Sequence, residues 1–166
     1  MIEITDTAVS APSQDGLYSH QVPQADLAIF KTIDVNADGQ RVFRALTVPE
    51  YLETWISIPG AAPDSLTVAS AEGNGYRLDH ISPGLAPVRI TGFFLFCHLR
   101  KIRLLWRKSA NASCGRSLVD FRVRGNFARS ILELRHTALG SADDYAWHVA
   151  LWQRSLERLA HILRKS

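Results

Sequence analysis

Histidine is the residue type of this chain that could exchange protons near neutral pH, and six histidines occur. His136 is the best placed, because it alternates with Leu132 and Leu134 on the side of a predicted strand that should face inward. In a pocket, its imidazole could hold the polar end of a ligand or act as a general acid or base. The alternative, which the sequence favours, is a structural histidine bonded to a neighbouring backbone group.

Other reactive arrangements are missing from the sequence. Cys97 and Cys114 have no metal or redox spacing between them, which favours free thiols. His148 has no second histidine three or four residues away, so it forms no helical metal pair. Neither Gly-x-Ser-x-Gly nor a phosphate-binding glycine loop occurs. We therefore expect no metal and no cofactor. No catalytic pair is identifiable, which argues against an enzyme but leaves that question open.

Large aromatic side chains are the more informative signal. Tryptophans and a phenylalanine fall on four different predicted elements, and all can converge between a sheet and a terminal helix. Large apolar pockets with few polar groups bind small apolar molecules. The alternative is a filled core with no usable cavity, since aromatic residues more often serve packing. The candidate ligand-binding residues are Trp55, Phe93, Leu95, Trp106, Phe121, His136, Trp152 and Leu156.

The last helix is the element that should position these residues. Six large apolar side chains recur at steps of four and three residues, which places them on one stripe of a helix over 143–163. They are Tyr145, Val149, Trp152, Leu156, Leu159 and Leu163. Asp143 and Asp144 before the stripe, and Arg164 and Lys165 after it, complement the helix dipole. A stripe of this width requires a broad apolar surface to pack on.

Strands supply that surface. A first strand is predicted over 27–35, and two short helices separated by Pro49 follow it. Six further strands are predicted over 66–71, 76–82, 88–99, 102–106, 118–123 and 129–139. Sequential strands with short connections pair antiparallel. The sequence therefore predicts one α+β domain over 25–166, in which a curved sheet of about seven strands wraps the C-terminal helix. Residues 1–24 have few apolar groups and are predicted to form a mobile arm.

Charge and composition limit the partners. A net charge of +3 is a weak argument for nucleic acid, and 46% hydrophobic content is ordinary for a globular domain. No secretory signal or membrane-spanning segment is evident, so a cytoplasmic location is expected. Four arginines fall on the predicted outward side of neighbouring strands, and this surface could bind an acidic partner or could be a solvated face interleaved with Asp120. They are Arg103, Arg107, Arg122 and Arg124.

The strand over 88–99 is apolar on both faces. Ile90, Phe94 and Phe96 lie on one side, and they alternate with Phe93, Leu95 and Cys97 on the other. Burying both faces requires cover on both sides. The second cover could be the N-terminal arm, a second copy of the chain in a homodimer, or another protein.

Three stretches resemble a known family. FKTIDVNADGQRVFRALTVPEYLETWI is similar to the opening of the domain related to the activator of the heat-shock chaperone ATPase, with its strand, helix, proline-containing joint and tryptophan. SILELRHTAL resembles the penultimate strand of that family, and LWQRSLERLAHIL resembles its terminal helix. Leu151 stands where the family often has glycine. The order of elements is the plan of the START-like, or SRPBCC, helix-grip superfamily.

The resemblance implies a function. It implies that a small hydrophobic molecule, lipid-like or polyketide-like, binds between the sheet and the C-terminal helix, and that Phe93, Leu95 and Cys97 face inward. One alternative is a protein-interaction or chaperone-regulating module with a filled core. A second is an enzyme like the superfamily's cyclases and aromatases, in which the pocket positions a reactive chain.

Overall fold

The computed structural model of the protein describes residues 27–62, 66–71, 74–81, 86–109 and 116–164. The predicted arm over residues 1–24 and the position of Cys114 lie outside the described residues. The described residues form seven strands and three helices. They are β1 (Leu27–Val35), α1 (Gly39–Thr47), α2 (Pro49–Trp55), β2 (Leu66–Ala71), β3 (Gly75–His80), β4 (Val88–His98), β5 (Lys101–Ser109), β6 (Arg116–Gly125), β7 (Ser130–Leu139) and α3 (Ala142–Arg164).

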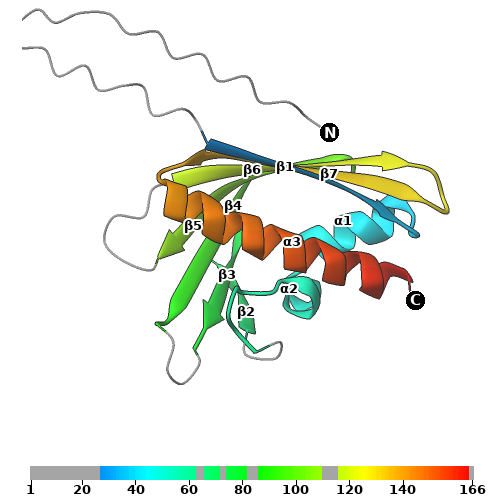
Figure 1. Cartoon of the computed structure of the whole chain (residues 1–166). Coiled ribbons are helices and arrows are strands. Elements are labelled where there is room, and N and C mark those ends of the chain that lie inside the picture. The colour runs from blue at the N-terminus through cyan, green and yellow to red at the C-terminus, as the bar shows by residue number, and fades with distance from the viewer. Residues whose placement is uncertain (1–26, 63–65, 72–73, 82–85, 110–115, 165–166) are drawn as a thin grey trace, which may run out of the picture.

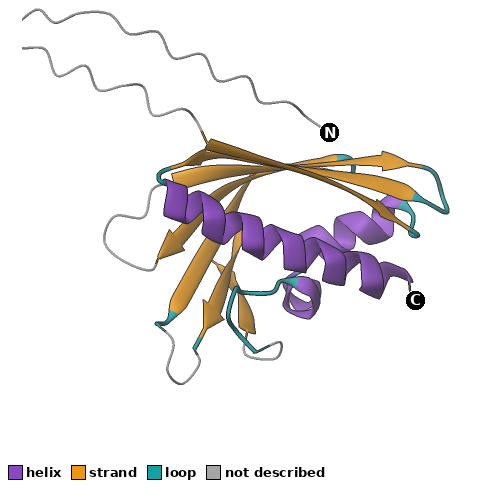
Figure 2. Ribbon diagram, in the orientation of Figure 1, coloured by secondary structure: helices purple, strands orange, loops and turns teal. Residues whose placement is uncertain are grey.

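The strands form one antiparallel sheet in the order β1-β7-β6-β5-β4-β3-β2. The three helices lie on the same side of this sheet, and α3 crosses its inner face (Figure 1, Figure 2). Two short helices precede β2, as expected, and the long helix ends the fold. The predicted α+β helix-grip architecture is therefore confirmed. Of the helices in the described residues, none is long and apolar enough to cross a membrane.

The sheet is strongly curved, and its two halves stand in different relations to the long helix (Figure 1). α3 lies closest to β1 and β7. In contrast, β2, β3 and β4 curve away beneath α3, and α2 packs against β2. Large side chains must therefore fill the space between α3 and the β2–β4 half of the sheet.

α3 buries most of the predicted stripe. The side chains at the centre and end of the stripe are at most 5% exposed, and they are Trp152, Leu156, Leu159 and Leu163. Tyr145 and Val149, near the start of the helix, are half-buried. Two polar side chains, His148 and Ser155, are also buried on this face. The sequence pattern did not predict them, because the buried stripe was defined by the spacing of apolar residues alone.

The joint between α1 and α2 has a local physical cause. The Asp38 side chain accepts hydrogen bonds from backbone N–H groups in the first turn of α1, which caps that helix. Val48 ends α1, and Pro49 begins α2 at a position where a missing N–H costs little. Nε1 of Trp55 donates to the backbone oxygen of Ala45 at 2.8 Å, so the two helices are fixed to each other.

β4 departs from the expected orientation. Phe94 pairs with the fully buried Leu104 and so shares the inner face, whereas Phe93 pairs with the half-buried Leu105 on the outer face. The register then shifts between Phe94 and Phe96, which leaves Leu95 57% exposed. The expectation that Phe93 and Leu95 face inward is therefore wrong. A strand that is apolar on both faces does not reveal its parity, and the bulge changes that parity again.

Cys97, the third residue expected to face inward, is also exposed. It pairs with the buried Ile102, so it is on the inner side of the strand pair. It lies one residue before the end of β4. The inward direction of this residue therefore does not bury it.

Candidate functional site

The predicted aromatic residues converge only in part. The rings of Trp106 on β5 and Trp152 on α3 lie 5.2 Å apart, and the ring of Phe121 on β6 lies 5.8 Å from that of Trp152. His136 on β7 joins them, with its ring 5.9 Å from that of Trp152. All four side chains are at most 3% exposed. Trp55 instead lies beside a different groove, between the short helices and the end of α3.

His136 has hydrogen bonds at both ring nitrogens. Its Nδ1 accepts a hydrogen bond from Nε1 of Trp152 at 2.9 Å. An indole nitrogen can only donate, so Nδ1 carries no proton and Nε2–H must donate to Oγ of Ser117, at 2.7 Å. The Ser117 hydroxyl donates in turn to the backbone oxygen of Trp106. These bonds give His136 a structural role, although its partners are side chains and not the neighbouring backbone group that was expected. Its role in holding a ligand stays a prediction.

His148 forms the second half of this buried polar network. Its Nε2 accepts a hydrogen bond from Nε1 of Trp106 at 3.2 Å, and its Nδ1–H donates to the backbone oxygen of Asp144 at 2.8 Å. The Asp144 carboxylate lies 2.9 Å from Nζ of Lys108, and that ammonium lies 4.2 Å from the ring centre of Trp147. Sequence reasoning considered His148 only as a metal ligand. Its position one turn before Trp152 could have placed it on the buried face.

Burial keeps both of these histidines neutral. The pKa of His136 is lowered to about 2, mainly by burial and secondarily by the neighbouring His148, whose ring centre is 4.6 Å away. Burial also lowers the pKa of His148, although the backbone oxygen and carboxylate of Asp144 oppose this effect. Two neutral imidazoles with occupied nitrogens hold fixed positions. They are poorly suited to proton transfer at neutral pH.

His80 differs from this pair. It lies at the end of β3, is 1% exposed, and shares the inner face with Tyr76 and Leu78. Neither of its ring nitrogens has a hydrogen-bond partner in the described structure. A buried polar atom without a partner is costly, and such atoms are rare enough to call for an explanation. Among the described residues, His80 is the buried side chain whose polar atoms have no hydrogen-bond partner.

Tyr76 lies on β3, on the same inner face as His80. Its ring is 2% exposed and meets the rings of Phe94 and Trp106 edge to face. It packs directly over Gly92 on β4, where a Cβ atom would come within 2.7 Å of the tyrosine ring. Burial raises the pKa of the Tyr76 phenol. The β3–β4 part of the inner face is therefore an aromatic wall with His80 at its end.

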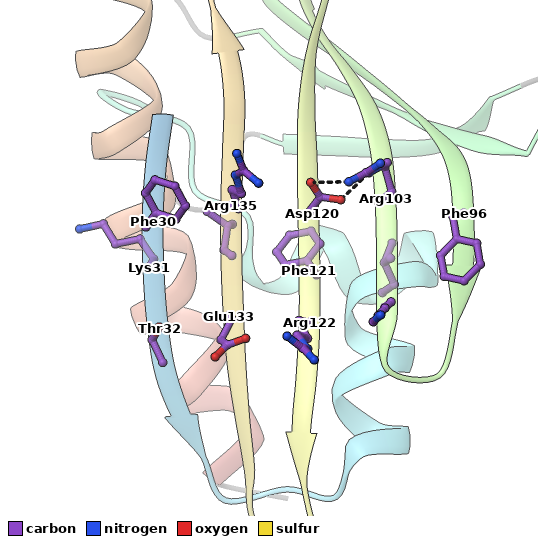
Figure 3. Close-up of a pocket in the computed structure, with 13 residues that line it drawn as sticks. Phe30, Lys31, Thr32, Phe96, Arg103, Asp120, Phe121, Arg122, Glu133 and Arg135 are labelled. Atoms are coloured by element: carbon purple, nitrogen blue, oxygen red, sulfur yellow. Dashed lines mark hydrogen bonds and ion pairs between the residues drawn. The ribbon is translucent and has the colours of Figure 1, made fainter. Parts of the chain in front are cut away.

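A separate groove lies on the opposite, outer face of the sheet (Figure 3). It has a volume of about 560 Å³ and extends from Phe30 on β1 to Phe96 on β4. Both phenylalanines are more than half exposed. We call this feature the outer groove. The predicted outward arginines are all exposed, and two of them pair with carboxylates: Arg103 with Asp120 at 2.6 Å, and Arg124 with Glu133.

Several solved structures share this fold. A protein from Chromobacterium violaceum is 18% identical with a TM-score of 0.68, over 84% of this chain and 99% of that one. CalU16 from Micromonospora echinospora is 19% identical with a TM-score of 0.55, over 83% of this chain and 76% of that one. The Aha1 dimer from Colwellia psychrerythraea is 15% identical with a TM-score of 0.60, over 83% and 96%. At these identities the likeness shows the fold alone.

Comparison of the sequence with known families shows which family the chain belongs to. No curated protein matches the chain. Residues 36–164, from the end of β1 to the end of α3, match the family described as Activator of Hsp90 ATPase homolog 1-like protein. This match includes both short helices, the sheet beyond β1 and the whole buried polar network. The chain therefore belongs to the Activator of Hsp90 ATPase homolog 1-like family.

Proposed function

We propose that this domain binds a small hydrophobic molecule with a polar end, of a lipid-like or polyketide-like kind, between the β2–β4 half of the sheet and α3. The observation that carries the proposal is His80, which is buried with both ring nitrogens unpartnered on the inner face. A ligand atom that donates or accepts a hydrogen bond there would remove the cost of burying an unpaired imidazole.

The surroundings of His80 suit the apolar part of such a ligand. Tyr76, Leu78 and Ile90 are buried on the same inner face of β3 and β4. Ligand sites of this kind have apolar and aromatic walls with few polar groups. α3 packs on β1 and β7, whereas α2 packs on β2, so a guest held at His80 would contact the β2–β4 side of the core rather than the β1 side.

The buried histidine pair has a supporting role in this proposal. His136 and His148 hold the indole nitrogens of Trp152 and Trp106 by hydrogen bonds. Fixed indoles form a rigid wall, and rigidity before binding reduces the ordering cost on binding. His136 would then position a wall of the site without touching the ligand. This role differs from the one that the sequence suggested for it.

A second candidate function is an interaction module with a filled core. The ring contact between Trp106 and Trp152 favours it, because these side chains occupy the centre of the space that a ligand could otherwise use. In that case the activity would lie on the surface, and the inner face would serve stability only. No described arrangement favours the cyclase-like enzyme, since both histidines of the network are held neutral.

Ligand titration separates the two candidates. A panel of fatty acids, sterols and polyketide-like aromatics is titrated into the protein, and tryptophan emission and the melting temperature are followed. Ligand binding predicts a saturable change in both readouts for at least one compound with a polar end. Silence from every compound would favour the interaction module.

A matched pair of variants then tests the role of His80. His80→Leu should weaken a polar-ended ligand about two- to tenfold, which corresponds to the loss of one hydrogen bond. A purely hydrocarbon ligand should bind His80→Leu as well as before. His98→Leu is the control, because His98 is an exposed histidine of β4. Equal weakening of all ligands by His80→Leu would mean that the change damages the fold and not a specific contact.

A further inference from the structure

The outer groove combines exposed aromatic side chains with an excess of positive charge. Phe30 is 66% exposed at one end and Phe96 is 52% exposed at the other. The outward-facing charged residues of the lining include four cations and two carboxylates, for a net charge of +2. They are Lys101, Arg103, Arg122, Arg135, Asp120 and Glu133. Exposed phenylalanines flanking such a strip are typical of a surface that another segment covers.

The two carboxylates already have partners at the sheet surface. Asp120 bonds to Arg103 at 2.6 Å, and Glu133 pairs with Arg124, which lies beside the groove. Lys101 and Arg122 face each other across β5 and β6, with no carboxylate partner within the described structure. Glu133 is the cross-strand neighbour of Arg122, but it is ion-paired with Arg124. Lys101 and Arg122 therefore retain an excess of positive charge, which an acidic segment would offset.

We infer that residues 1–26 of this same chain dock in the outer groove. This segment contains four acidic residues and neither lysine nor arginine, so its charge is opposite to that of the groove. The acids are Glu3, Asp6, Asp15 and Asp26. Apolar residues lie between them, and Ile4, Leu17 and Tyr18 are suited to contact the exposed phenylalanines. The inference concerns the opposite face of the sheet from the proposed ligand site and is independent of it.

Position along the chain favours this occupant. Residue 26 directly precedes β1, and Phe30 is the fourth residue of that strand. Crossing from β1 to β4 spans four strand spacings, or about 19 Å, which about six extended residues can cover. A tethered segment also acts at a high effective concentration, of millimolar order for short flexible linkers. A second copy of the chain is less suitable, because groove against groove would oppose two surfaces of the same positive sign.

Paramagnetic relaxation in the full-length chain tests the docking. A spin label is placed on Ser10→Cys in a background in which Cys97 and Cys114 are replaced by serine. Docking predicts that backbone amides of Phe30, Arg122 and Phe96 relax faster, and that Leu159 on α3 does not. The enhancement should fall as salt is raised from about 0.05 M to about 0.5 M. If no groove amide is affected, the inference is wrong.

Paired charge reversals test whether the groove itself is responsible. Lys101→Glu with Arg122→Glu should remove most of the enhancement. Arg107→Glu with Arg116→Glu is the matched control, because these cations also face each other across β5 and β6 on the outer face but do not line the groove. Adding Asp6→Lys and Asp15→Lys to the groove reversal should restore the enhancement. An equal loss in both pairs would show general attraction and contradict docking in the groove.

Mixing experiments identify the occupant. Spin-labelled protein without isotope is mixed with isotope-labelled protein without spin label, so that only contacts between chains are detected. Docking of the chain's own arm predicts no enhancement in the mixture and no change on dilution of the doubly labelled protein. Enhancement in the mixture would assign the groove to a second copy and overturn the inference.

Discussion

Nε1 of Trp152 donates a hydrogen bond to Nδ1 of His136 at 2.9 Å, and this contact joins α3 to β7 inside the core. It fixes the tautomer of the imidazole, directs Nε2–H to Ser117, and places the indole against Trp106. One bond between helix and sheet thus sets the orientation of a whole polar network. The stability of the domain should reflect this.

Acid should destabilise the protein through its buried histidines. The folded pKa of His136 is lowered to about 2 and that of His148 is lowered, whereas an unfolded histidine titrates near pH 6.5. Below about pH 6.5 the unfolded chain binds more protons, so the free energy of unfolding falls as pH falls. The cost from His136 alone should approach about 1.4 kcal/mol per pH unit well below pH 6.5, and it should total about 1.6 kcal/mol between pH 6.5 and pH 5.

Urea denaturation at several pH values measures this dependence. His136→Gln should be less stable at neutral pH but should lose less stability on acidification. His98→Gln is the control, because its side chain is exposed, and it should show the slope of the unchanged protein. A slope that does not change in His136→Gln would mean that other groups cause the acid sensitivity.

Trp152→Ala should destabilise the fold by about 3–5 kcal/mol, because it removes a large buried side chain and leaves Nδ1 of His136 without its donor. Trp147→Ala is the comparison on the same helix, since Trp147 is only half-buried, and it should cost less. Chemical denaturation of both variants measures the difference. A loss below about 1 kcal/mol for Trp152→Ala would contradict the described helix register.

His80→Leu should stabilise the protein in the absence of ligand. The change removes two buried nitrogens that have no partner in the described structure, and burying such atoms costs about 1–3 kcal/mol. Thermal and chemical denaturation of the delipidated protein measure the gain. If the variant is less stable than the original, His80 has an intramolecular partner, and its availability to a ligand would be in doubt.

Deleting residues 1–22 should leave a folded domain, since the first strand begins at Leu27. Removal of the arm should also uncover Phe30 and Phe96 and increase self-association, which light scattering on the two proteins would detect. A truncated protein that shows no gain in self-association would argue that the arm does not cover these residues.

Periodicity predicted most of the architecture because the buried faces of α3 and the central strands are regular. The helix expected over 143–163 spans Ala142–Arg164, and the joint at Pro49 separates α1 from α2. Strand ends were less well predicted. β5 and β6 extend to the pairing of Arg107 with Arg116, because backbone pairing requires no apolar side chain.

The candidate site was predicted less completely, for two physical reasons. Phe93 and Leu95 were misplaced because alternation carries no information on orientation when both faces are apolar, and because a bulge is a local feature of pairing. His80 and His148 were not assigned their positions because partners in space decide whether a buried histidine is satisfied. Trp106, Phe121 and Trp152 converge as the order of elements predicted, whereas Trp55, which was expected to join them, lies beside another groove.

The most direct test of ligand binding at the inner face is the ¹⁵N chemical shift of the histidine side chains during titration with a polar-ended compound from the panel. The proposed site predicts a saturable shift of both ring nitrogens of His80, while those of His136 and His148 keep the tautomers that their indole donors fix. A titration in which His80 does not shift, or in which only the exposed His98 shifts, would contradict the proposed site.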